Sequence, residues 1–292
     1  MAATRWTAGY RPMLTAPINK IIPFSNVDGP GNRTSIFFQG CPFNCLFCHN
    51  PETIHLCRSC GACVASCPTH ALSRDDTGAV HWDSSRCVQC DTCIKTCPHD
   101  ASPKVRQMTV EEVLREIKRS APYIRGITTS GGECTLQNEF LIELFTRVHA
   151  LGKTCLIDSN GSFDFEADPR VLSVSEGVML DVKAVEPGWS DQLISYPRET
   201  VLKNLDYLLR VGKLYEVRTI LFPGRDRENE ETVRYVAAHI QDGCFYKLIR
   251  YRPFGVRERY QKLLGEDETD AEYAESFARL ARELGAKNAY IV

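Results

Sequence analysis

Residues 27–51 read VDGPGNRTSIFFQGCPFNCLFCHNP, and the rest of the fold can be inferred outward from them. Their central part, TSIFF (34–38), is apolar and rich in β-branched and aromatic residues, which predicts a strand. The strand leads directly into Cys41, Cys45 and Cys48, spaced C-x3-C-x2-C. Three thiolates leave one iron of a [4Fe–4S] cluster free to bind a small chelating molecule. A zinc site or three structural thiols would not explain the upstream strand and the aromatic Phe47, so the cluster is favoured.

Two further cysteine runs follow, each spaced C-x2-C-x2-C-x3-C-P, at residues 57–68 and 87–98. In bacterial ferredoxins this spacing binds two [4Fe–4S] clusters, and the fourth cysteine of each run ligates the other cluster. The predicted ligands are Cys57, Cys60, Cys63 and Cys97 for cluster A, and Cys87, Cys90, Cys93 and Cys67 for cluster B. Paired zinc sites are the alternative, but they normally use two separated CxxC pairs rather than two complete runs.

The composition separates this chain from secreted, membrane and nucleic-acid-binding proteins. Of its 292 residues 43% are hydrophobic and 25% are charged, with a net charge of −2, so nothing indicates a nucleic acid or a membrane surface as partner. The first twenty residues contain no apolar core of a signal peptide, and no apolar run is long enough to span a bilayer. Clustered cysteines without an export signal indicate metal binding in a reducing cytoplasm, rather than disulfides.

Apolar strands and amphipathic helices alternate along the rest of the chain, which predicts a parallel α/β sheet. The expected strands are residues 34–38, 124–129, 154–158, 177–182, 215–222 and 245–251, with a short apolar piece at 289–292. The expected helices are residues 109–118, with a capping box between Thr109 and Glu112, and 138–150, 199–211, 228–240 and 271–284. Six units are fewer than the eight of a full barrel, so a partial (β/α)6 TIM-type barrel is expected over residues 1–50 and 104–292. Residues 51–103 form an inserted ferredoxin-like domain after the first strand, stabilised by its clusters.

The segment VDGPG, the following Arg33, FFQGC, the cysteine loop and CHN together resemble the amino-terminal motif of glycyl radical enzyme activating enzymes, which belong to the radical S-adenosylmethionine (SAM) superfamily. With the ferredoxin insert behind this motif, the chain is similar to the ferredoxin-containing branch of that family. Within the branch, KIIPFSNVDGPG, SGGE and DSNG look most like the YjjW-type activases. The resemblance extends from Asn19 to the C-terminus.

The resemblance implies a SAM site built from three later segments. In SGGE (130–133) it implies that Gly131, Gly132 and Glu133 meet the amino group of SAM, although Cys134 stands where the family usually has proline. From DSNG and MLDVK it implies a monovalent cation (Na⁺ or K⁺) beside the SAM carboxylate. The implied cation ligands are Asp158, Ser159, Met179 and Asp181. A turn and a surface salt bridge are the alternatives without a functional role for these two segments.

Three basic features have more than one interpretation. Lys183 would neutralise the SAM carboxylate and is also a catalytic candidate beside the three cluster cysteines. Arg218 lies inside a predicted strand, where a buried charge needs a partner; a SAM group and a core ion pair are equally consistent with it. The arginine-rich segment 250–259 either packs on adenine or is a solvated loop.

The resemblance implies an oxidoreductase with three [4Fe–4S] clusters and SAM. Flavodoxin or ferredoxin would supply the electron, SAM would be cleaved to methionine and a 5′-deoxyadenosyl radical, and that radical would take hydrogen from a backbone glycine of a YjjI-like glycyl radical enzyme. Two alternatives stay open. One is a radical SAM enzyme acting on a small molecule or peptide, and the other is a non-catalytic iron–sulfur electron carrier.

Overall fold

The computed structural model describes residues 13–240 and 242–292. Its main element is a nine-stranded sheet in the order β11-β10-β9-β8-β7-β6-β2-β1-β5. In this sheet order, all neighbouring strands between β11 and β2 run parallel. Strand β1 pairs antiparallel with β2 and with β5. The strands are β1 (Thr15–Ser25), β2 (Arg33–Phe38), β5 (Arg106–Thr109), β6 (Gly126–Gly131), β7 (Thr154–Ser159), β8 (Gly177–Asp181), β9 (Leu214–Leu221), β10 (Phe245–Arg250) and β11 (Ala289–Ile291).

The six strands expected from apolar runs are confirmed as β2 and β6 to β10, with ends within two residues of the expected ones. Their side chains are mostly buried, because one face of the sheet is covered by helices and the other lines the interior. A chain that alternates parallel strands with helices brings all carboxyl ends of the strands to one edge. The α/β fold therefore gathers the segments that follow these strands.

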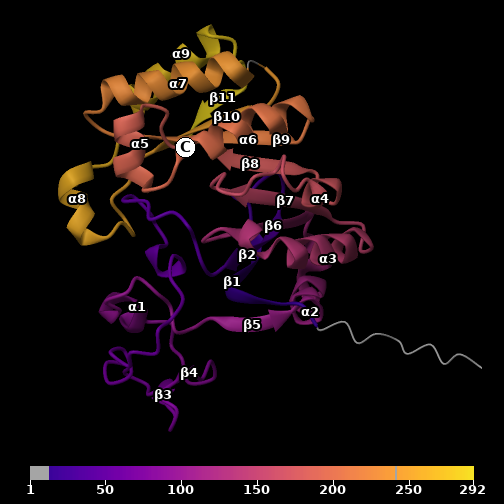
Figure 1. Cartoon of the computed structure of the whole chain (residues 1–292), viewed down its shortest axis with the longest axis vertical. Helices are drawn as coiled ribbons and strands as arrows, with labels where there is room; N and C mark the ends of the chain where they lie inside the picture. Colours follow the sequence, from indigo (N-terminus) through magenta and orange to yellow (C-terminus); the bar gives the residue numbers. More distant parts are fainter. Residues whose placement is uncertain (1–12, 241) are drawn as a thin grey trace, which may run out of the picture.

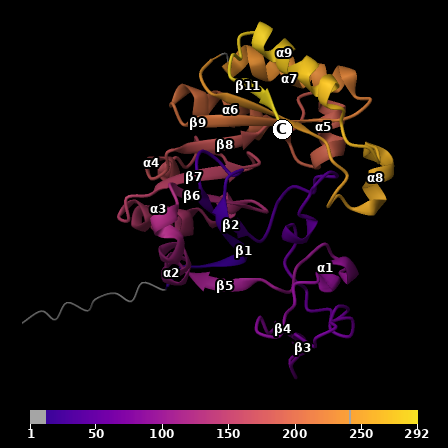
Figure 2. The ribbon, with the colours of Figure 1, turned by 180° about the vertical axis from the view of Figure 1, so that it is seen from behind.

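The helices lie along the outside of the sheet (Figures 1 and 2). The capping box is confirmed, because the Thr109 side chain accepts from the Glu112 backbone while the Glu112 side chain accepts from the Thr109 backbone. The expected helices are found as α2 (Val110–Ser120), α3 (Asn138–His149), α6 (Arg198–Arg210), α7 (Asp226–Ile240) and α9 (Ala271–Glu283). Three short helices were not anticipated: α4 (Arg170–Ser173), α5 (Pro187–Ile194) and α8 (Glu258–Leu264).

The antiparallel strands β1 and β5 were also not anticipated. β1 reads TAPINKIIPFS, in which two prolines and four polar residues interrupt the alternation, and its pairing with β2 shifts register twice. β5 has only four residues. Because β1 precedes β2, residues 51–103 follow the second strand of the sheet, not the first as expected.

Residues 51–103 form a small lobe at the lower end of the molecule in Figure 1. It contains η1 (Pro51–Thr53), the hairpin of β3 (Leu72–Arg74) and β4 (Val80–Trp82), and α1 (Thr92–Thr96). Its apolar cluster is separate from the main core and small, with Cys63, Leu72 and Cys93 at the centre. So few apolar side chains would stabilise a fold weakly, as expected for a unit that depends on bound groups.

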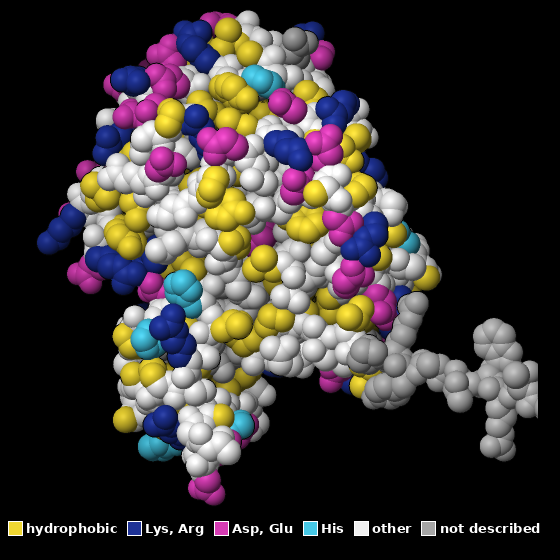
Figure 3. All heavy atoms as spheres, viewed as in Figure 1, with side chains coloured by type: hydrophobic (Ala, Val, Ile, Leu, Met, Phe, Trp, Pro, Cys, Tyr) yellow, Lys and Arg dark blue, Asp and Glu magenta, His cyan; other side chains and the backbone are white. Residues whose placement is uncertain are grey.

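The space-filling view shows the lobe projecting from the rest of the molecule, with basic and acidic side chains interspersed over the visible face (Figure 3). Among the helices of the described residues, none has both the length and the apolar character needed to cross a bilayer.

Candidate active site

The carboxyl ends of β6 to β9 and the loop after β2 enclose a cavity of about 290 Å³, here called the inner cavity. Ten of the residues singled out from the sequence line it: Cys41, Cys45, Cys48, Gly131, Gly132, Asp158, Ser159, Asp181, Lys183 and Arg218. Strand register explains the convergence, since Phe38 lies opposite Gly131, Asp158 opposite Met179 and Asp181 opposite Arg218. Glu133 and Met179 do not line the inner cavity.

The cysteine loop carries three thiols that are shielded from solvent, so that they would ionise only beside a positive charge. Burial raises the pKa of Cys45 to about 12, although the nearby Lys183 ammonium opposes this shift. Burial likewise raises the pKa of Cys41 and of Cys48. Such thiols stay neutral unless a metal displaces their protons, because coordination supplies the missing charge. The donor set and its burial therefore suit an iron–sulfur cluster.

Arg257 ties the cysteine loop to the lobe. Its guanidinium donates to the Cys45 carbonyl (2.8 Å), to the Asn44 side chain (2.7 Å) and to the Asp100 carboxylate (2.9 Å). Its side chain is only 6% exposed, while Arg259, which pairs with the same carboxylate, is 56% exposed. The arginine-rich segment is thus a structural connection at Arg257 and a solvated surface at Arg259.

Replacing Arg257 by methionine should lower the free energy of unfolding by about 1–3 kcal/mol, because the buried Cys45 carbonyl and the partly buried Asn44 amide oxygen lose their donor. The matched Arg259→Met change should cost less than about 1 kcal/mol, since exposed ion pairs contribute little. Anaerobic thermal unfolding of the cluster-loaded protein measures both. Equal losses for the two variants would contradict the connecting role of Arg257.

The SGGE segment packs against the cysteine loop. A Cβ on Gly131 would lie 2.2 Å from the Phe38 nitrogen, and one on Gly132 would lie 2.2 Å from the Gly40 carbonyl oxygen. Both glycines are thus required for the approach of one backbone to another. Glu133 is buried, and burial raises the pKa of its carboxylate against four hydrogen bonds from Thr135, Ser159 and Asn160. Its partners are the protein's own groups, so Glu133 positions the end of β7.

Alternating charges line the floor of the inner cavity. Asp158 pairs with Arg218 at 2.8 Å and accepts from Ser130 at 2.9 Å. Burial raises the pKa of Asp158 while Arg218 opposes that shift. Lys183 pairs with Asp181 at 2.5 Å, and the pKa of this lysine is raised because the charge and the hydrogen bond of Asp181 oppose its burial.

Arg218 forms the core ion pair that was one of the two interpretations left open by the sequence. Its guanidinium also pairs with Glu216 at 2.6 Å and lies 3.0 Å from the Met179 sulfur, so it is a core ion pair. It lines the inner cavity as well, so a ligand there would meet it. The pKa of Arg218 is raised, because Asp158 and Glu216 outweigh its burial.

The family model described as "Radical SAM superfamily" matches residues 35–236, more than half of the chain. This chain belongs to the radical SAM superfamily. The match begins in β2, includes the cysteine loop and ends in α7, and it therefore contains all of the residues singled out at the inner cavity.

Curated relatives of this radical SAM chain are activating enzymes. The indoleacetate decarboxylase activating enzyme of Tractidigestivibacter scatoligenes is 31% identical over 82% of this chain and 84% of its own. A putative glycyl-radical enzyme activating enzyme of Haemophilus influenzae is 29% identical over 83% and 84% of the two chains. The solved structure of Streptococcus suis SuiB bound to precursor peptide SuiA is 11% identical, with a TM-score of 0.55 over 86% of this chain and 46% of that one. That likeness concerns the fold alone.

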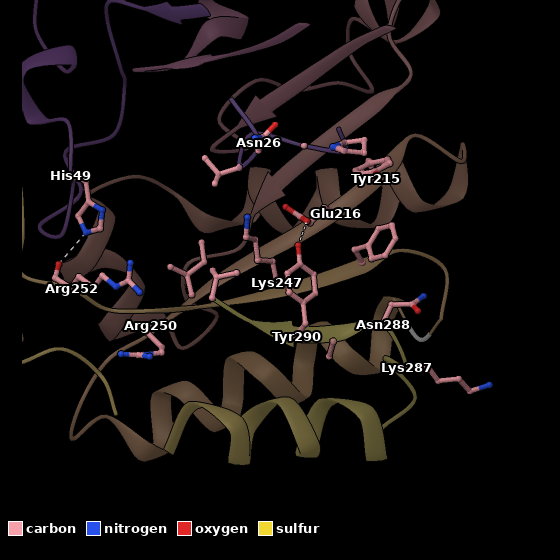
Figure 4. Close-up of a pocket in the computed structure, with 17 residues that line it drawn as sticks. Asn26, His49, Tyr215, Glu216, Lys247, Arg250, Arg252, Lys287, Asn288 and Tyr290 are labelled. Carbon is pink, nitrogen blue, oxygen red and sulfur yellow. Dashed lines mark hydrogen bonds between the residues drawn. The ribbon is translucent and has the colours of Figure 1, made fainter. Parts of the chain in front are cut away.

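A second, larger hollow of about 950 Å³ opens beside the inner cavity of this radical SAM fold, and we call it the outer groove (Figure 4). Its walls are β9, β10, β11 and the loop at residues 26–30. His49 and Ile249 line both hollows, so the two adjoin. Tyr290 donates to Glu216 at 2.7 Å across its floor, and the Lys247 side chain rises from β10 beside this pair (Figure 4). The outer groove is not predicted by the sequence motifs, and only the alternation of Phe245, Lys247 and Ile249 along β10 signals it.

The lobe places its two cysteine runs in matching backbone conformations. Residues with positive φ recur at equivalent positions, 30 residues apart, in Ser59 and Gln89 (52° and 55°), Gly61 and Asp91 (79° and 57°), and His70 and Asp100 (50° and 48°). Left-handed backbone at a non-glycine residue costs about 1 kcal/mol or more, so its repetition indicates a shared constraint. Cys67, Cys87, Cys90 and Cys93 line one small cavity. Burial raises the pKa of Cys63 to about 11, and the neighbouring Cys93, Cys57 and Cys97 thiols raise it further.

One group lies outside these hollows. The ligand atoms of His149, Cys155 and Glu176 all lie within 4.8 Å of one another at the amino ends of β7 and β8. Glu176 accepts from the Cys155 backbone nitrogen and lies 3.1 Å from His149. These contacts hold the start of β7 in place, at the edge of the sheet opposite the inner cavity.

Proposed function

We propose that this chain binds SAM in the inner cavity and installs a glycyl radical in a partner glycyl radical enzyme. The observation that carries the proposal is the contact between the three-cysteine cavity and the outer groove at His49 and Ile249. When bound on Cys41, Cys45 and Cys48, a [4Fe–4S] cluster supplies the electron that splits SAM into methionine and a 5′-deoxyadenosyl radical, which takes a hydrogen atom from glycine and leaves as 5′-deoxyadenosine. No general base is needed for such a transfer.

The sulfur positions support iron–sulfur clusters over zinc. A zinc ion binds thiolates at about 2.3 Å, so that their sulfurs lie about 3.8 Å apart. In the part of the chain that the structure describes, which includes every cysteine, no three thiols have sulfurs that all lie within 4.8 Å of one another. A cubane of four irons holds its thiolates farther apart than a single zinc ion does, which favours the cluster assignment; all fourteen cysteines are free of disulfides.

The charged floor of the inner cavity fits the zwitterionic end of SAM. The Lys183 ammonium and the Arg218 guanidinium would bind its carboxylate, while the Asp158 carboxylate and the Ser130 hydroxyl would accept from its ammonium group. We include in this proposal a Na⁺ or K⁺ ion on oxygens of Asp158, Ser159, Asp181 and the Met179 backbone. Hard oxygen ligands suit such ions.

Residues 51–103 are proposed as an inserted ferredoxin domain that carries clusters A and B, attached to a partial (β/α)6 barrel. The matching left-handed residues of its two cysteine runs support this assignment. Cys57 and Cys41 line one further cavity, so cluster A would be the neighbour of the cluster in the barrel. Flavodoxin or ferredoxin would be the reductant.

The outer groove is proposed to receive the glycine-bearing segment of the partner, a YjjI-like enzyme. A groove that opens along the edge strand β11 can take an extended segment without the partner unfolding. The second candidate, a radical SAM enzyme acting on a free peptide or small molecule, would use the same groove. The activating-enzyme relatives favour the first.

The test is anaerobic electron paramagnetic resonance of the reconstituted, reduced protein mixed with SAM and a candidate glycyl radical enzyme. We expect a glycine-centred doublet that disappears when the partner's glycine is replaced by alanine. If several such partners give no doublet while 5′-deoxyadenosine still forms, the small-molecule or peptide alternative replaces this proposal.

A further inference from the structure

One polar atom of the lobe is buried without a partner. The indole Nε1 of Trp82, at the end of β4, makes no hydrogen bond to any described residue although it is shielded from solvent. A buried indole N–H normally finds an acceptor, because an unpaired buried donor costs about 1–3 kcal/mol. The missing acceptor for the Trp82 N–H therefore needs an explanation. A common explanation is a bound group that supplies the acceptor.

Trp82 lines a small cavity whose other lining residues include four thiols, those of Cys67, Cys87, Cys90 and Cys93. These are the predicted ligands of cluster B. The other charged groups at this cavity are already paired, since the Lys104 ammonium contacts the Asp91 carboxylate at 2.6 Å. Their charges largely cancel, so the indole N–H is the buried side-chain donor without a partner among the described residues that line this cavity.

We infer that the Trp82 indole N–H donates a hydrogen bond to a sulfur of cluster B and makes cluster B the more easily reduced of the two clusters in the lobe. The inference rests on the proposed ferredoxin domain. A donor to a cluster sulfur stabilises the reduced state, which carries one more negative charge, and so raises the reduction potential. The oxidised cluster takes this single electron from the external reductant, flavodoxin or ferredoxin.

The other hydrogen bonds to cysteine sulfurs in the lobe also favour a higher reduction potential for cluster B. At the cluster B cysteines, the Ala71 backbone donates to Cys67 at 3.3 Å and the Thr92 hydroxyl lies 3.3 Å from Cys90. At the cluster A cysteines, the described residues offer one such bond, from the Ser59 backbone to Cys57 at 3.4 Å. Cluster B would thus hold the first electron, and cluster A, beside Cys41, would pass it inward.

The experiment is a redox titration of the full-length, cluster-loaded protein followed by electron paramagnetic resonance. Trp82→Phe keeps the apolar ring and removes the N–H. At a fixed potential near the midpoint we expect the reduced-to-oxidised ratio of cluster B to fall roughly fivefold, about 40 mV for a one-electron couple, with the other clusters unchanged. His81→Gln is the matched control, because this neighbour on β4 is exposed and pairs with Asp75; it should leave all potentials unchanged.

Three results would overturn the inference. The first is an unshifted cluster B potential in Trp82→Phe protein with full iron content. The second, needed if that variant loses cluster B, is the absence of hyperfine coupling between reduced cluster B and ¹⁵N-indole in labelled wild-type protein. The third is a wild-type protein that binds only enough iron for a single cubane. That result would also overturn the proposed ferredoxin domain, and the iron content distinguishes it from the first result.

Discussion

Replacing Cys45 by alanine should abolish SAM cleavage and remove about four of the roughly twelve irons expected for three cubanes. Cys45 is buried, its carbonyl is fixed by Arg257, and it faces the inner cavity beside Lys183. With only two thiolates left, a second iron of the cubane has no protein ligand, and the loop no longer holds the cluster. The readouts are 5′-deoxyadenosine formed under anaerobic reduction and iron bound per chain.

Cys244→Ala is the matched control, because this thiol is also buried but lies just before β10 and lines neither hollow. It should retain iron and SAM cleavage. Clusters A and B should still be reducible in Cys45→Ala protein. SAM cleavage at the wild-type rate in that variant would refute the assignment of Cys45 to the cluster. The non-catalytic electron carrier would be supported instead if the reduced wild-type protein formed no 5′-deoxyadenosine from SAM.

Features that depend on neighbouring residues alone could be predicted from the sequence. The six parallel strands are continuous apolar runs, and the helix after Thr109 has a complete capping box, so both could be predicted without knowledge of their packing. The three cysteines of the loop after β2 could be linked to a strand because they follow it directly in the sequence. The convergence of Asp158, Asp181 and Lys183 followed from one rule, that parallel strands present their carboxyl ends at the same edge.

Features that depend on long-range packing could not be predicted. β1 forms because β2 and β5 offer it partners, while its own sequence alternates poorly. The hydrogen bonds that Ser159 and Asn160 donate to Glu133 come from a different strand end and could not be read from the SGGE segment. The outer groove joins residues from β9 to β11 with the loop at 26–30, segments nearly the whole chain apart.

Gly132→Ala should be one of the most damaging single-methyl changes in the sheet domain. The new Cβ would lie 2.2 Å from the Gly40 carbonyl oxygen and 2.8 Å from that of Thr53, so backbone on both sides must move. The Gly132 and Glu133 nitrogens donate to Phe38 and Gly40 at 2.9 and 2.8 Å, and such movement would break these bonds. We expect a stability loss of about 3 kcal/mol, and a loss of SAM cleavage on the order of 100-fold because Cys41 follows Gly40 directly.

Gly188→Ala separates this clash from the general cost of replacing a glycine. Gly188 lies in α5, where an added Cβ would meet only the Glu186 side chain at 3.5 Å, and alanine favours helix. That variant should be as stable as the wild type and fully active. Thermal unfolding and 5′-deoxyadenosine formation, measured on both variants with equal iron content, give the comparison. If Gly132→Ala protein cleaves SAM normally, the SGGE backbone does not set the position of the cysteine loop, and the contact between them has no part in the chemistry.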